Sequence, residues 1–303
     1  MIRRILVPLD GSDLAEAALP AAAVLAERLR ASVGLVHVLE RHAPRTVHGR
    51  PHLGASEPAE AYLKRIAASR FPSSVRVRTH VHPEEVDDVA RSISEHAEHR
   101  QEPGGDLIVM CTHGRGDLGN AILGSLGQRV TALGSTPVLL LRAGAAAAEF
   151  RCRSLLLPLD RREGHGEALE IGAELAAAFG ASVELLLIVP TFATLSGRWV
   201  ATGRFLPGTT SRMLDLSAAE ERKFLEEQTK ALRGRGLAVS AEVGRGDPAR
   251  SICRAAGKRH PDLIVLGTHG RIGLGAVWEG SVANKVCRRC GVPVLLVPVS
   301  RKP

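Results

Sequence analysis

The sequence predicts an α/β protein made of two doubly wound five-stranded parallel sheets, one in each half of the 303-residue chain. The first observation is a set of short, nearly continuous apolar runs such as "LLLP" and "DLIVLG". Such runs are typical of strands that are buried on both faces of a parallel sheet. The second is that these runs alternate with helical segments, which indicates βαβ units. The third is that the whole series occurs twice.

The elements of the first half follow from these patterns in chain order. Apolar residues of the first predicted helix recur at helical spacing at Leu14, Ala18, Leu25 and Leu29. We expect strands at residues 4–10, 32–40, 75–81, 106–111 and 137–142, and helices near 13–30, 57–70, 84–99 and 125–133, with an irregular segment at 41–56.

The second half follows the same plan. Its third helix has a clear start signal, because Asp247 can cap it and Pro248 fits the first helical position. Its second helix is predicted to begin at Ser217, which forms a capping box with Glu220.

The halves are a tandem duplication with the motif order preserved. "VPLD" at 7–10 returns as "LPLD" at 157–160, and "THGR" at 112–115 returns at 268–271. We expect domains at 1–143 and 151–301, joined by the Ala/Gly-rich segment "RAGAAAAEF".

Composition narrows the class of protein. No run reaches the ~18 apolar residues of a membrane span, and the apolar start is too short for a secretory leader, so we expect a cytoplasmic protein without membrane contact. The net charge of +8 is scattered and aromatic residues are only 3%, which argues against nucleic acid as a partner. The lone CxxC at Cys287 and Cys290 is too small a ligand set for structural zinc, so we expect buried thiols there.

The glycine-rich segments carry the functional signal. In "GTHGRIGLGAVWEGS", Gly267 and Gly270 follow a predicted strand, and Gly280 precedes Ser281 at a predicted helix start. Glycine lets the backbone approach a ligand, and successive amides with a helix N-terminus form an anion site. The alternative is a tight connection in which Ser281 and Ser125 only cap helices.

At these motifs the chain resembles the universal stress protein family. The resemblance rests on "VPLDGS", on "DLIV…THGR…LGS" and on a closing "PVLL" strand, and it covers both halves. It implies the strand order 3-2-1-4-5 and ATP, ADP or AMP at the strand ends, with or without Mg²⁺. It also implies pairing through the last strands, here within one chain as a pseudo-dimer, with a homodimer left open.

The resemblance also implies which residues bind the nucleotide. Those expected to face adenosine are Pro8, Asp10 and Val38 in the first half, and Pro158, Asp160 and Ile188 in the second. Those expected to hold phosphate are Cys111, Gly114, Gly124 and Ser125 in the first half, and Gly267, Gly270, Gly280 and Ser281 in the second. Arg115 and Arg271 either reach phosphate oxygens or are solvated loop charges.

Each half departs from the family pattern at one place. Cys111 replaces the first glycine, and its side chain adds bulk and disfavours positive φ. In the second half "DRREGHG" replaces "DGS", so Arg161 and Arg162 either add charge for phosphate or block the pocket. We expect the second site to be the better binder, because its glycines are complete.

The function expected is a nucleotide-binding regulator of the stress-response type that signals to a protein partner. One alternative is a slow ATPase assisted by His269 or Asp160, and another is a scaffold with decayed sites. No catalytic set is predicted, and His113 and His269 are expected to serve loop packing. Histidines also alternate on one predicted strand (His80 and His82) and lie a turn apart on the next helix (His96 and His99). No cysteine or carboxylate set completes a metal site there, so we expect solvated histidines.

Overall fold

The computed structural model describes residues 1–43, 46–47, 50–99, 104–112, 125–142, 150–161, 165–195, 205–268 and 281–299. The chain divides into two compact units. The first contains Met1–Arg151 together with the last strand, β12 (Val294–Pro298), and the second contains Cys152–Gly267 and Ser281–Val292. None of the helices in these ranges is both long and apolar enough to cross a bilayer.

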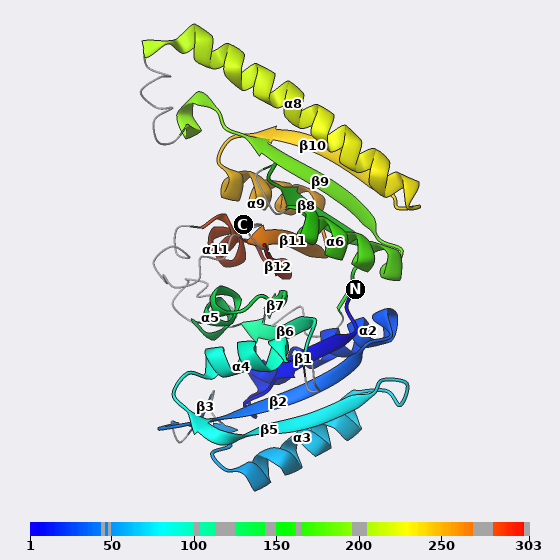
Figure 1. The fold of residues 1–303 in the computed structure, drawn as a ribbon, viewed down its shortest axis with the longest axis vertical. Coiled ribbons are helices and arrows are strands. Elements are labelled where there is room, and N and C mark those ends of the chain that lie inside the picture. Colours follow the sequence, from blue (N-terminus) through cyan, green and yellow to red (C-terminus); the bar gives the residue numbers. More distant parts are fainter. Residues whose placement is uncertain are drawn as a thin grey trace. The chain divides into compact units, whose positions relative to one another are not determined.

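The sheet of the first unit has the predicted topology. Its parallel strands lie in the order β5-β2-β1-β6-β7, which is 3-2-1-4-5 when the short β3–β4 pair is set aside (Figure 1). The central strand is buried because Ile5, Leu6 and Val7 have no exposed surface. The strands are β1 (Arg4–Pro8), β2 (Ser32–Glu40), β5 (Val77–Val86), β6 (Leu107–Thr112) and β7 (Val138–Arg142), and the antiparallel pair is β3 (Thr46–Val47) and β4 (Arg50–Pro51).

Helices cover both faces of this sheet. They are α1 (Asp13–Glu16), α2 (Leu19–Leu29), α3 (Ser56–Arg70), α4 (Val89–Glu98) and α5 (Ser125–Leu133). α2 packs beside α3, and α4 packs beside α5. Right-handed crossovers put these two pairs on opposite faces, because the chain first winds outward from β1 and then returns past it.

The second unit repeats the arrangement. Its strands lie parallel in the order β10-β9-β8-β11, which corresponds to 3-2-1-4, and α8 lies along β10 (Figure 1). The strands are β8 (Ser154–Leu159), β9 (Ser182–Val189), β10 (Val239–Arg245) and β11 (Leu263–Thr268). The helices are α6 (His165–Phe179), α8 (Pro207–Gly234), α9 (Pro248–Arg259) and α11 (Val282–Arg289), with a 3₁₀ turn η1 at Phe192–Thr194.

The last strand of the chain belongs to the first unit. β12 pairs with β7 in antiparallel register, with Val294 opposite Leu140 and Leu296 opposite Val138. β12 also follows β11 in the strand order, as expected for the fifth strand of the second half. An apolar edge strand exposes unpaired N–H and C=O groups, and pairing two such edges satisfies both.

The repeated "DLIV" motif has a structural role. The Oδ2 atom of Asp106 accepts hydrogen bonds from the backbone N–H groups of Arg3 and Arg4, at 2.9 and 3.0 Å. Asp262 does the same in the second unit, accepting from Arg153 and Ser154 at 2.7 and 3.1 Å. Each aspartate therefore fixes the start of strand four against the start of strand one, which sets the register at their carboxyl ends.

Two boundaries predicted for the first half are wrong. The helix expected at 13–30 is broken into α1 and α2, because Pro20 in the first turn of α2 lacks an N–H and cannot continue a preceding helix. The helix expected from 84 begins only after Asp88, whose side chain caps Arg91 N–H. β5 instead continues through Pro83 to Val86, since an edge strand tolerates a residue without a donor.

The start of the second helix of the second half is also wrong. α8 begins at Pro207, so Ser217 and Glu220 lie inside the helix and form no capping box. A buried stripe that already includes Thr210 and Leu214 continues the helix toward the N-terminus. The cap predicted at Asp247 is confirmed, because its carboxylate accepts from Arg250 N–H at 2.8 Å.

Candidate functional site

The strand order places the predicted site residues of the first unit at its topological switch point. In such sheets ligands bind beyond the carboxyl ends of strands one and four, here β1 and β6. Pro8 ends β1, Asp10 follows it, and Cys111 lies near the end of β6. Leu6 pairs with Ile108, so continuing the register puts the ends of both strands side by side. Val38 lies near the end of β2 and is 7% exposed.

The turn after β1 holds the carboxylate of Asp10. Its Oδ1 atom accepts hydrogen bonds from the backbone N–H and the hydroxyl of Ser12, at 2.9 and 2.6 Å. Ser12 Oγ in turn accepts from Ala15 N–H at 3.1 Å and caps α1. Gly11 between them has φ of +86°, which disfavours any residue with a Cβ.

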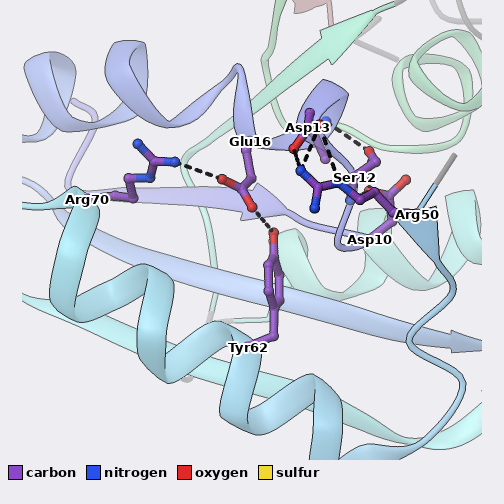
Figure 2. A network of polar contacts seen from close by, with 8 residues as sticks. Asp10, Ser12, Asp13, Glu16, Arg50, Tyr62 and Arg70 are labelled. Carbon is purple, nitrogen blue, oxygen red and sulfur yellow. Dashed lines mark hydrogen bonds and ion pairs between the residues drawn. The ribbon is translucent and has the colours of Figure 1, made fainter. Parts of the chain in front are cut away.

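A network of polar contacts braces this turn, as Figure 2 shows. Arg50 pairs with Asp13 at 2.8 Å, and Arg70 pairs with Glu16 at 3.1 Å. The hydroxyl of Tyr62 donates to Glu16 at 3.2 Å. Burial, and then the negative charge of Glu16, raises the pKa of Tyr62 well above its ordinary range. Both acids of α1 are thus tied to β4 or α3, which fixes the turn that carries Asp10.

A shallow pocket of about 330 Å³ lies beside this network and contains none of the predicted site residues. Its acids and two of its arginines pair with one another, so it shows no free cluster of charge to bind an anion. Its lining includes Gly11, Asp13, Glu16, Arg50, Arg65 and Arg70.

A buried histidine of β2, His37, supports the end of β1. The ring of His37 is 1% exposed. Its Nδ1 lies 2.8 Å from the carbonyl oxygen of Leu9, and its Nε2 lies 2.8 Å from that of Leu53. His37 therefore links the residue before Asp10 to the segment that leads into α3.

The second unit brings its predicted residues to the equivalent place. Asp160 follows β8, and Gly267 lies in β11. Leu156 pairs with Ile264, so continuing the register puts Gly267 level with Leu159, next to Asp160. Pro158 lies in β8 opposite Leu186, at the same end of the sheet.

Ile188 owes its space to a glycine on the neighbouring strand. It pairs with Gly244 of β10, and a Cβ at that glycine would lie 2.7 Å from Ile188 Cδ1. The branched side chain expected to contact the base is therefore positioned by the absence of a side chain opposite it.

Of the two predicted phosphate-binding helix starts, the structure describes the serines, Ser125 and Ser281. The Ser281 hydroxyl accepts from Asn284 N–H at 3.1 Å and caps α11, as the alternative interpretation of this serine required. Ser125 is the first residue of α5. The remaining loop residues lie outside the described residues: Gly114, Arg115, Gly124, Gly270, Arg271 and Gly280, together with His113, Arg162 and His269.

The structure adds a residue that sequence reasoning missed. Glu221 of α8 has a buried Oε2 with no hydrogen-bond partner among the described residues. Burial raises its pKa; Arg161 opposes this, and the negative charges of Asp160 and Glu220 add to it. Glu221 therefore lies within electrostatic reach of Asp160. No sequence signal marked it, because it sits within a charged run of a long helix.

Two expectations about individual residues change. Arg161 pairs with Glu220 at 3.2 Å, so its guanidinium is directed toward α8. Cys111 and Gly267 both lie within strands, in extended backbone, so the argument from positive φ is wrong at this position. Of the two arguments against Cys111, only the bulk of its side chain remains.

The close contact between cysteines of the second unit does not join the two cysteines of the CxxC motif, and all of them are free thiols. Cys290, at the end of α11, lies with its Sγ 2.6 Å from Sγ of Cys253 on α9. The contact with Cys290 lowers the pKa of Cys253 against the opposing effect of burial. Burial raises the pKa of Cys152 to about 12.

These features define a tandem α/β protein with a switch point in each doubly wound unit. The Universal stress protein family model matches the chain twice, at residues 1–142 and 152–298, so the chain belongs to the universal stress protein family.

Curated relatives support this membership. Universal stress protein MJ0531 of Methanocaldococcus jannaschii is 28% identical over 150 residues, which cover 50% of this chain and 84% of the relative. Universal stress protein YxiE of Bacillus subtilis is 27% identical over 147 residues, which cover 47% of this chain and 97% of the relative.

Solved structures share the fold along the whole chain. A universal stress protein from Archaeoglobus fulgidus has a TM-score of 0.73 at 17% identity, covering 97% of this chain and 98% of that one. A functionally unknown protein from Pseudomonas aeruginosa has a TM-score of 0.60 at 20% identity, covering 98% and 93%.

Proposed function

We propose that the chain is a stress-response regulatory protein that binds ATP, ADP or AMP, with or without Mg²⁺, and that its second unit holds the stronger site. The observation that carries this proposal is the meeting of Asp160 and the side-chain-free Gly267 at the ends of β8 and β11. A carboxylate there can accept hydrogen bonds from ribose hydroxyls or from adenine. Bare backbone beside it lets phosphate oxygens approach the amides.

Two further features support the second site. The buried Oε2 of Glu221 lacks a hydrogen-bond partner among the described residues, and a ribose hydroxyl would supply one. Ile188 presents a branched apolar side chain next to Gly244, suited to the face of a base. The pattern of Gly267, Gly270, Gly280 and Ser281 then supplies the phosphate contacts expected from sequence.

The first unit is proposed as the weaker site. The hydrogen bonds from Ser12 hold the carboxylate of Asp10 in place, which supports a nucleoside contact in this unit. Cys111 places a thiol where Gly267 has none, which hinders phosphate approach. The antiparallel pairing of β12 with β7 fits an intrachain pseudo-dimer, and light scattering on the full chain separates a monomer from a homodimer of chains.

The decisive experiment asks whether nucleotide accompanies the protein. Mass spectrometry of the supernatant after denaturing the purified full chain should detect an adenine nucleotide. Thermal shift should then show stabilisation, about 2.7 kcal/mol at a ligand concentration of 100 times Kd. No released nucleotide and no shift with ATP, ADP or AMP would replace this proposal with a scaffold that has decayed sites.

Two matched pairs of variants test the assignment. Glu221→Gln should weaken binding about tenfold or more, since a hydrogen bond to a charged group contributes about 1.5–3 kcal/mol. The control variant Glu227→Gln should leave affinity unchanged, because Glu227 is an exposed glutamate further along the same helix. Gly267→Cys should remove the stronger site, and Cys111→Gly should strengthen the weaker one. Equal effects of the two glutamate variants would contradict the placement of the nucleoside.

Whether the protein also hydrolyses ATP is tested separately from binding. Phosphate release that survives purification and disappears in His269→Ala would favour a slow ATPase over a binding protein. Tight binding with no phosphate release supports the regulatory function, in which nucleotide binding changes a surface that a partner protein recognises.

A further inference from the structure

Three histidines of the first unit converge on one point of the sheet surface. His80 and His82 alternate along β5 and so share a face, and His96 lies on α4, which packs over that face. One ring nitrogen from each lies within 4.8 Å of those of the other two. The ring of His96 is 5.1 Å from that of His80 and 5.0 Å from that of His82, centroid to centroid.

We propose that His80, His82 and His96 form a binding site for one divalent transition-metal ion of the zinc class. Imidazole nitrogen suits Zn²⁺ and its neighbours, whereas Mg²⁺ prefers oxygen ligands. A tetrahedral site with Zn–N bonds of about 2.1 Å needs nitrogens about 3.4 Å apart. The three ring nitrogens lie within 4.8 Å of one another, so small side-chain rotations would suffice to reach that spacing, and a water molecule would take the fourth position.

The hydrogen bonding of His96 already matches that of a ligand. Its Nδ1 lies 2.7 Å from the backbone carbonyl oxygen of Ser92, one turn earlier on α4, and an N–H there donates to that oxygen. In neutral imidazole this leaves the Nε2 lone pair for a metal. Metal-binding histidines commonly use their second nitrogen in this way, which fixes the tautomer and orients the ring.

Burial favours the neutral form of two of the rings, those of His80 and His96. Burial lowers the pKa of His80, and the neighbouring charges of His96 and His82 lower it further. Burial also lowers the pKa of His96, against the hydrogen bond to Ser92 and the charge of Glu95. Within the described residues, neither His80 nor His82 has a side-chain hydrogen bond that would otherwise explain its place.

The second unit shows that the fold does not require these histidines. His80 pairs with Val36 and His82 with Val38, whereas the equivalent strand positions opposite Leu186 and Ile188 are Glu242 and Gly244. Counted from the helix caps Asp88 and Asp247, the counterpart of His96 is Ala255. The duplicated copy thus keeps the strand and the helix without any of the three rings.

The test is a titration of the metal-free full chain with Co²⁺ in the absence of nucleotide. The expected result is one equivalent of four-coordinate Co²⁺, seen as strong visible d–d bands, which Zn²⁺ displaces. His96→Ala, or His82→Gln if the first variant fails to fold, should lower affinity at least about 100-fold, since even changes to outer-shell groups cost about 10–100-fold. The matched control is His99→Ala, which removes an exposed histidine from the end of the same helix.

The design separates this site from other metal-binding groups. The thiol pair of Cys253 and Cys290 would add a thiolate charge-transfer band, so the titration is repeated in Cys253→Ser, where the d–d bands should persist. An octahedral spectrum in the wild type, or equal losses in His99→Ala and His96→Ala, would overturn the proposal. Neither result bears on nucleotide binding, which is measured by different variants in the second unit.

Discussion

The aspartate of the repeated motif allows a quantitative prediction about stability. In Asp106→Ala, two backbone N–H groups at the start of β1, those of Arg3 and Arg4, lose their acceptor, and the 2.9 Å ion pair with the Arg4 guanidinium is lost. An unsatisfied N–H costs about 1–3 kcal/mol, and partial access to water places each at the lower end. Adding about 1 kcal/mol for the part-buried ion pair, we expect Asp106→Ala to lower the free energy of unfolding by about 2–3 kcal/mol in total.

The assay is hydrogen exchange of the β1 amides, supported by urea unfolding followed by circular dichroism. A loss of 2–3 kcal/mol should speed exchange through opening of β1 by about 30- to 150-fold. Asp106→Asn keeps an oxygen that can accept from both N–H groups, so it should cost only about 1 kcal/mol. A similar cost for the alanine and asparagine variants would refute the backbone-capping argument.

The same residue predicts how stability depends on pH. Burial alone would raise the pKa of Asp106, but hydrogen bonds from Arg4 and from Arg3 N–H outweigh it and lower the pKa below its ordinary value of 3.8. The unfolded chain therefore binds this proton at higher pH than the folded one. The stabilisation is present above pH ~4 and is lost as pH falls through the folded value. Asp106→Asn should reduce this acid-dependent loss.

Three other predictions test the local geometry. Gly11→Ala should destabilise the first unit by about 1–2 kcal/mol, because φ is +86° and Leu53 is close, whereas Gly54→Ala should change stability by less than about 0.5 kcal/mol in a urea melt. Iodoacetamide at neutral pH should label Cys253, whose pKa is lowered by its neighbouring thiol, well before Cys152, whose pKa is raised to about 12; peptide mass spectrometry would expose the reverse order. Ser281→Ala should cost about 1 kcal/mol through the lost cap of α11, and an unchanged melt would mean that the cap contributes nothing.

Much of the candidate site was predictable because its residues follow from strand ends. "VPLD" and "DLIV" identify strands one and four, and parallel order then puts Asp10 and Asp160 at switch points. Glu221 could not be predicted, since its neighbour Asp160 is on another element and only the packing of α8 brings them together. The histidine cluster was visible as two separate spacings, but their convergence depends on how α4 lies across β5.

The sequence by itself determined what depends on neighbours along the chain: the duplication, the apolar strands, the helix start at Asp247 and the glycine pattern. These features come from periodicity and from hydrogen bonds spanning a few residues. The tertiary structure alone decided how far α8 and β5 extend and that three histidines meet. Those outcomes depend on burial and on edge pairing between distant segments, and no local pattern encodes them.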